Sequence, residues 1–151
     1  MSIFNALNTS ASALTAQRLR MDIVSSNIAN AQTTRATVNE NGEYEPYRRK
    51  MVVAEPKEQS FQSFLQKASH TSSSPGAGVK VTKIIEDDEP FKLVYSPGHP
   101  DANEAGYVQM PNVDPLKEMV DLMSATRSYE ANVTSLNATK NMLLKALEIS
   151  K

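Results

Sequence analysis

The last quarter of the chain is a long stretch in which nothing interrupts a helix. No Gly or Pro occurs in 116–151, and Asp114 followed by Pro115 is typical of a helix start, with a capping carboxylate and a proline in the first turn. The sequence therefore predicts one helix over about 115–149. Such a helix is about 52 Å long, whereas a compact globule of this length is roughly 40 Å across. A globule formed by its own chain cannot contain this helix.

The apolar residues of this segment repeat at alternating spacings of three and four. The series is Met119, Leu122, Thr126, Tyr129, Val133, Leu136, Lys140, Leu143 and Leu147. Seven of the nine are apolar or aromatic, which is typical of a coiled-coil seam. Further apolar residues widen the face at both ends, so we expect more than one neighbouring helix there.

The N-terminal segment carries a weaker version of the same pattern. Leu7, Leu14, Met21 and Ile28 recur every seven residues, which predicts an amphipathic helix within 1–31. Its many Ser and Thr residues lower helix propensity, so it needs a partner to remain helical. From the two seams we predict an assembly interface. Its members are Leu7, Leu14, Met21, Ile28, Met119, Leu122, Tyr129, Val133, Leu136, Leu143 and Leu147.

The middle of the chain has a different character. Residues 36–111 hold seven of the eight Pro and all five Gly. Runs rich in β-branched and aromatic residues at 48–55, 79–86 and 91–95 predict strands. Segments 97–100 and 103–106 are typical of turns. The Ser-rich segment 68–78 predicts a flexible linker, preceded by a short amphipathic turn around Phe61, Phe64 and Leu65.

Composition excludes several classes of function. The net charge of -1 provides no field for nucleic acid or an acidic membrane surface. The chain has no Cys and only two His, so thiol chemistry is excluded and a multi-histidine metal site is disfavoured. No run approaches the roughly 20 apolar residues of a membrane span, and the N-terminal segment lacks the pattern of a cleavable signal peptide. We expect no membrane insertion and no nucleic-acid partner.

Four polar motifs have an unremarkable interpretation that we favour over a chemical one. The acidic run 86–89 is interpreted as a solvated turn, because it lacks the spacing of a Ca²⁺ loop. The basic run 47–50 could bind phosphate, but it flanks a strand and is better interpreted as edge protection. His99 and Asp101 lie in a predicted turn without a nucleophile, and His70 lies in the linker. We predict no catalytic residue, no metal and no cofactor.

Two long motifs resemble a known family. Residues 5–33, "NALNTSASALTAQRLRMDIVSSNIANAQT", are similar to the N-terminal signature of bacterial flagellar rod, hook and other axial proteins. That signature centres on S-N-I-A-N-A-N-T, and Gln32 replaces its last Asn. Residues 90–149, which contain "GYVQMPNV" and "EMVDLMSATRSYEANV", resemble the C-terminal half of a proximal-rod member. The similarity covers 1–33, 47–55 and about 79–149, and is weakest over 56–76.

The resemblance implies a structural subunit of the flagellar basal body. Members leave the cell through the flagellar type III export apparatus without a cleaved signal peptide. They assemble with themselves and with other rod proteins into a helical tube that transmits torque for motility. Their two terminal helices pair, and their middle forms a small β element.

Together these observations predict an α+β fold, with long terminal helices pairing as an antiparallel coiled coil and a small, mostly β middle. We divide the chain into an N-terminal helix of the rod core (1–33), a β-rich middle (34–111) with a flexible linker at about 56–78, and a C-terminal helix of the rod core (112–151). Two alternatives remain open. One is a soluble coiled-coil adaptor or export chaperone, and the other is an enzyme with its site around His99 and Asp101.

Overall fold

The fold is taken from a computed structural model that describes residues 3–39, 42–57 and 78–149. The chain divides into two compact units. One comprises the described residues of Met1–Leu19, Val53–Lys83 and Ala125–Lys151, and the other comprises those of Arg20–Val52 and Ile84–Ser124. Each unit contains a stretch of both helices. The predicted short turn around Phe61 and most of the predicted linker lie outside the described residues.

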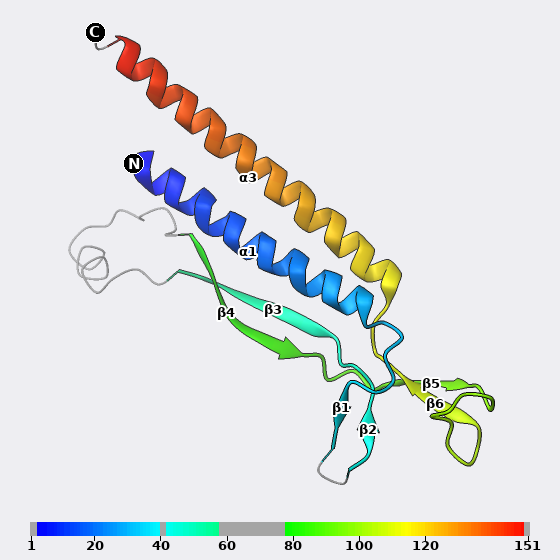
Figure 1. Cartoon of the computed structure of the whole chain (residues 1–151). Coiled ribbons are helices and arrows are strands. Elements are labelled where there is room, and N and C mark those ends of the chain that lie inside the picture. Colours follow the sequence, from blue (N-terminus) through cyan, green and yellow to red (C-terminus); the bar gives the residue numbers. More distant parts are fainter. Residues whose placement is uncertain (1–2, 40–41, 58–77, 150–151) are drawn as a thin grey trace. The chain divides into compact units, whose positions relative to one another are not determined.

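Two long helices form the α part of the fold. Helix α1 runs from Ile3 to Ala29, and helix α3 runs from Pro115 to Ile149. They pack together side by side in opposite directions, which confirms the predicted α+β fold with paired terminal helices (Figure 1). The predicted start of α3 is also confirmed, because Asp114 Oδ1 accepts a hydrogen bond of 3.1 Å from the backbone N–H of Leu116. Neither helix is long and apolar enough to cross a membrane.

The described residues of the middle form three two-stranded sheets, β1 with β2, β3 with β4, and β5 with β6. The strands are β1 (Thr37–Val38), β2 (Tyr44–Glu45), β3 (Lys50–Pro56), β4 (Val79–Glu86), β5 (Lys92–Tyr95) and β6 (Tyr107–Met110). Strands β4 and β5 lie within two of the runs that the sequence predicts, and β3 overlaps the third and extends one residue beyond it. The sequence pattern does not predict β6 or the short β1–β2 hairpin; strands of two residues, such as β1 and β2, are too short to show alternation.

The β5–β6 hairpin is closed by the two predicted turns. The strands are antiparallel, with Val94 opposite Val108 and Tyr95 opposite Tyr107. Asn103 Oδ1 accepts hydrogen bonds from the backbone N–H groups of Ala105 (3.1 Å) and Tyr107 (2.9 Å). Val108 is almost fully buried, so one face of this hairpin contributes to the core of its unit.

Within the first unit, a glycine and a serine join β4 to α1. Ser12 Oγ accepts a hydrogen bond of 3.1 Å from the backbone N–H of Val79 and donates one to the carbonyl oxygen of Thr9. Gly78 has φ of +99°, and a Cβ atom at this position would overlap with Ser12 Oγ. The sequence at this point therefore requires glycine for both its backbone angle and its lack of a side chain.

We predict that Gly78→Ala lowers the free energy of unfolding by about 1–3 kcal/mol, because alanine is strained at this φ and collides with Ser12. Denaturant titration of the purified chain measures the change. Gly98→Ala is the matched control, because nothing lies within 4 Å of a Cβ added there. Equal effects of the two substitutions would show that Gly78 does not fix β4 against α1.

Candidate functional site

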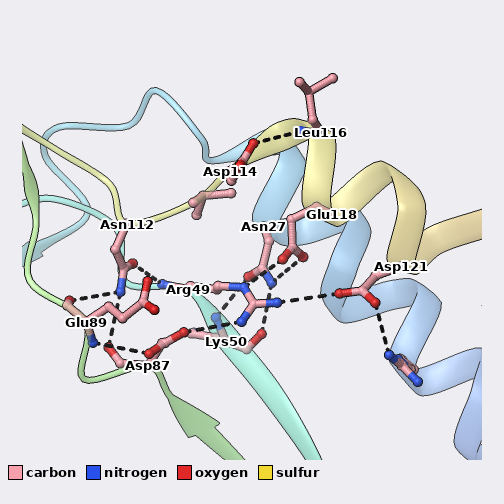
Figure 2. A network of polar contacts seen from close by, with 12 residues as sticks. Asn27, Arg49, Lys50, Asp87, Glu89, Asn112, Asp114, Leu116, Glu118 and Asp121 are labelled. Carbon is pink, nitrogen blue, oxygen red and sulfur yellow. Dashed lines mark hydrogen bonds and ion pairs between the residues drawn. The ribbon is translucent and has the colours of Figure 1, made fainter.

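A buried carboxylate lies at the centre of the second unit. Glu118, in the first turn of α3, is fully buried. Its Oε1 accepts a hydrogen bond of 2.6 Å from Nε of Arg49, and its Oε2 accepts one of 2.9 Å from Nδ2 of Asn27 (Figure 2). An isolated buried carboxylate is strongly unfavourable. The helix can therefore place Glu118 here only because α1 and the segment before β3 supply its donors.

Asn27 connects three elements and uses its full hydrogen-bonding capacity. Its Nδ2 donates to Glu118 and to the carbonyl oxygen of Lys50 (2.9 Å). Its Oδ1 accepts from the backbone N–H of Lys50 (3.0 Å) and from the hydroxyl of Tyr47 (3.0 Å). A side-chain amide offers two donors and two acceptor sites. Asn27 thus fixes α1, β3 and α3 relative to one another.

Arg49 offsets part of the negative charge of this region. Besides Glu118, its guanidinium contacts Asp87 (3.2 Å) and Asp121 (3.6 Å), and Asp121 also pairs with Arg20 of α1 (3.2 Å). Burial alone would lower the pKa of Arg49, but hydrogen bonds and attraction from Glu118 and Asp87 raise that pKa above its usual range. The guanidinium is therefore permanently charged.

A second asparagine attaches the chain on either side of β5 and β6 to the same arginine. Asn112 Oδ1 accepts a hydrogen bond of 2.8 Å from the backbone N–H of Arg49. Its Nδ2 donates to the carbonyl oxygens of Asp87 (3.2 Å) and Glu89 (3.1 Å). We call the whole set the polar cluster. Its members are Asn27, Tyr47, Arg49, Asp87, Asn112, Glu118 and Asp121.

The structure corrects two of the interpretations made from the sequence. The acidic run 86–89 is not merely a solvated turn, because Asp87 belongs to the polar cluster and is mostly buried. The basic run 47–50 does not protect a strand edge, because Arg49 points into the cluster and Arg48 lies over the ring of Phe91, 4.5 Å from its centroid. The sequence alone does not indicate these contacts, because the partners of both charge runs come from remote segments of the chain.

The end of the predicted turn that contains His99 and Asp101 is attached to the segment after α1 by an ion pair between Asp101 and Arg35. Asp101 accepts hydrogen bonds from Arg35 Nε (2.6 Å) and from the hydroxyl of Thr34 (2.8 Å). These bonds, the one from Arg35 first, lower the pKa of Asp101. Nδ1 of His99 accepts the backbone N–H of Asp101 at 3.2 Å. Asp101 is thus occupied by a structural ion pair. Among the described residues, no group of three or more His, Asp and Glu side chains is placed to hold a metal ion.

The predicted interface residues differ in exposure. The partly buried ones are Leu7, Leu14, Met21, Ile28, Leu122, Tyr129, Val133, Leu136 and Leu143. Met119 and Leu147 are exposed. The most covered face of α3 contains two alternating sets of residues. One set is Leu122, Tyr129, Leu136 and Leu143, and the other is Glu118, Ala125, Asn132 and Thr139. The covered face of α3 is therefore rotated by about half a residue from the most apolar series, so that Glu118 and Ala125 are buried in place of Met119 and Thr126.

This rotation leaves an apolar row uncovered at the start of α3. We call Leu116, Met119, Val120 and Met123 the exposed stripe, since at least half of the surface of each is accessible. At 3.6 residues per turn, Leu116, Val120 and Met123 lie on the side of the helix away from Glu118, and Met119 lies at the edge of this row. A second apolar group near the end of the helix is also exposed. It comprises Met142, Leu144, Leu147 and Ile149.

Comparison with known proteins places these features in a family. Residues 7–37 match the family described as flagella basal body rod protein. Residues 104–149 match the C-terminal region of the flagellar basal body rod FlgEFG proteins. The chain is 66% identical to the flagellar basal-body rod protein FlgC of Bacillus subtilis (strain 168) over 151 residues, covering 100% of both chains. The chain belongs to the FlgC family of flagellar basal-body rod proteins.

More distant relatives are also matched over almost their whole length. The FlgC protein of Escherichia coli O157:H7 is 44% identical over 154 residues, with 100% of both chains covered. That of Borreliella burgdorferi is 40% identical over 154 residues, covering 99% of this chain and 98% of the relative. The similarity therefore includes the segment 56–76, where the sequence motifs alone show the weakest resemblance.

The polar cluster of this FlgC-family chain was not predicted. Its two asparagines do lie inside the motifs that carried the resemblance, Asn27 in "SNIANAQT" and Asn112 in "MPNV". Asparagine is unfavourable inside a helix unless its side chain has a specific partner. Asn27, beside the apolar residue Ile28 of the N-terminal helix, was thus the signal in the sequence that could have indicated a buried polar contact.

We predict that Glu118→Ala lowers the free energy of unfolding by about 3–5 kcal/mol, because it leaves the Arg49 guanidinium buried without its main partner. The double variant Arg49→Met/Glu118→Leu should recover a large part of this loss, since it removes both charges. Urea titrations of the wild type and the two variants measure the loss and its recovery. Glu130→Ala, at an exposed position of the same helix, is the control. A loss no larger than that of the control would contradict the role of the cluster.

The acidity of Asp87 predicts a dependence of stability on pH. A hydrogen bond from the backbone N–H of Glu89 lowers the pKa of Asp87; burial opposes this, and Arg49 lowers it further. A carboxyl whose pKa is lowered in the folded state stabilises the fold above its unfolded pKa of about 3.9. That contribution is lost as the pH falls through the folded value.

We therefore expect the wild-type free energy of unfolding to decrease below about pH 4 more steeply than that of Asp87→Asn, which has no charge to lose at this position. Denaturant titration at a series of acidic pH values measures both curves. Asp88→Asn, at the exposed neighbouring position, controls for the change in net charge. Parallel curves for the wild type and Asp87→Asn would refute the contribution of this carboxylate.

Proposed function

We propose that this chain is a structural subunit of the flagellar basal-body rod, in its proximal part. It assembles with copies of itself and with other rod proteins through its terminal helices, and the assembled rod transmits torque for motility. Support comes from relatives named as basal-body rod proteins over the full length of the chain. The observation that carries the assembly role is the exposed stripe on α3, which the described part of the chain leaves uncovered.

The polar cluster prepares this surface for assembly. Because Glu118 and Asp121 hold the first turns of α3 against α1 and Arg49, the opposite side of the same turns is held in a fixed direction. A rigidly presented apolar face loses little entropy on binding. Neighbouring subunits that meet through two different surfaces form a non-closing helical array, which is the geometry of a rod.

The predicted interface residues fit this proposal in two groups. The partly buried residues of both helices, Leu14 and Leu136 among them, hold each subunit's helices together. The exposed Met119 and Leu147, with the remainder of the exposed stripe, contact neighbouring subunits. The partners are the terminal helices of further copies and of other rod proteins. The subunit acts mechanically and carries out no catalysis.

The proposal includes a route and a location. The chain leaves the cell through the flagellar type III export apparatus without a cleaved signal peptide, and it ends in the basal body. Family membership supports both statements. The alternative is a soluble adaptor or export chaperone that shares the helices but stays in the cell.

Fractionation separates these functions. Basal bodies purified with detergent from a strain that carries a tagged chain should contain the tagged protein, and a strain that lacks the chain should assemble no complete rod and be non-motile. An adaptor or chaperone would instead remain in the cytosolic fraction. Recovery of the chain only in the cytosol would overturn the proposal.

We predict that Met123→Asp is made and folds like the wild type but is absent from basal bodies, with loss of motility. Met123 is 54% exposed in the single chain, so the charge costs little until a neighbour covers it. Circular dichroism checks the fold, and blotting of purified basal bodies measures incorporation.

Thr134→Asp is the matched control for this variant. It adds the same charge at an exposed position on nearly the same side of α3, in a stretch of the helix that is polar. We expect appreciable incorporation of this variant. If Met123→Asp is incorporated as well as Thr134→Asp, the exposed stripe is not an assembly surface.

A further inference from the structure

The methionines that the structure describes fall into two groups. Met119, Met123 and Met142 are 53%, 54% and 65% exposed, and all three lie on α3. The others, Met21 on α1, Met51 on β3 and Met110 on β6, are partly buried. The thioether sulfur is thus most accessible on the helix that we assign to assembly.

The exposed methionines are members of apolar surfaces rather than isolated side chains. Met119 and Met123 are one helical turn apart and lie within the exposed stripe beside Leu116 and Val120. Met142 is in the exposed apolar group near the C-terminal end of α3. Methionine packs well on such surfaces because its side chain is apolar, unbranched and adaptable. Any change in its polarity therefore alters the contact surface directly.

We propose that the pair Met119 and Met123, and separately Met142, are oxidation sites that determine whether a subunit can assemble. The oxidant is a peroxide. The sulfur lone pair attacks one peroxide oxygen and the O–O bond breaks. For hydrogen peroxide the other oxygen leaves as water after proton transfer, so sulfur loses two electrons and the peroxide gains them. The product is methionine sulfoxide, which is polar and is reversed by methionine sulfoxide reductases.

The consequence follows from the position of these side chains. A sulfoxide on the exposed stripe costs the single subunit little, since water solvates it. In the rod it would have to be buried against an apolar neighbour, where a polar group without a partner is unfavourable. A free subunit that has been oxidised is therefore excluded from the rod. In an assembled subunit, contacts with neighbours protect the same methionines from oxidation. This inference rests on the proposed rod function.

The first experiment tests the site in the purified full-length chain. Hydrogen peroxide is added, and peptide mass spectrometry follows each methionine over time. We expect Met119, Met123 and Met142 to be oxidised at least roughly threefold faster than Met21 and Met51, because oxidation follows exposure. In purified basal bodies, Met119 and Met123 should be protected severalfold relative to the free chain. Equal rates for all methionines, or no protection in basal bodies, would overturn the proposal.

The second experiment tests the consequence for assembly. Wild type and the triple variant Met119→Leu/Met123→Leu/Met142→Leu are induced in a strain that lacks the chain and methionine sulfoxide reductases. Leucine conserves the apolar character and the approximate volume. Under sublethal hydrogen peroxide, we expect severalfold less wild-type chain in basal bodies and an unchanged amount of the triple variant.

The untreated cultures distinguish the two proposals. Suppose that both proteins enter basal bodies without peroxide. If peroxide then lowers the amounts of both proteins in basal bodies equally, or lowers neither amount, only the oxidation proposal is wrong. If the wild type fails to enter basal bodies without peroxide, the proposed rod function is wrong and the oxidation site falls with it.

Discussion

The ion pair between Glu118 and Arg49 is the interaction on which the second unit depends. The carboxylate is fully buried and the arginine side chain mostly so, and loss of either would leave a largely desolvated charge without its shortest ion pair. Their contact brings the first turn of α3 to the start of β3, and Asn27 adds α1 to the same point. Because hydrogen bonds fix direction as well as distance, the cluster defines how three remote segments meet. An apolar contact of the same size would allow them to slide.

A small hydrophobic core explains why the unit uses polar contacts in this way. Its buried apolar side chains, such as Val24, Val108 and Val113, are few and of modest size. Surface area buried within one chain is therefore limited, and the long helices offer apolar area that is not used internally. The chain divides the two tasks. The polar cluster specifies the geometry of the subunit, and much of the apolar surface of α3 stays available for contacts with other chains.

The sequence allowed prediction of features that depend on local chemistry. The cap at Asp114, the absence of Gly and Pro after Pro115, and the alternation in 79–86 each act over a few residues, and the structure contains α3 and β4 at those places. The polar cluster could not be predicted in this way. Glu118 and Arg49 are separated by 69 residues, and nothing near either of them indicates the other. Only the motifs around Asn27 and Asn112 carried information about the site.

The rotation of α3 relative to its most apolar series connects these observations. If the helix had turned Met119 towards α1, the most apolar face would be buried and Glu118 would point away from Arg49. The cluster forces the other orientation, with Ala125 and Asn132 on the covered face. The same rotation leaves Met119 and Met123 exposed, so the buried salt bridge determines which surface of α3 is available for the assembly that we propose.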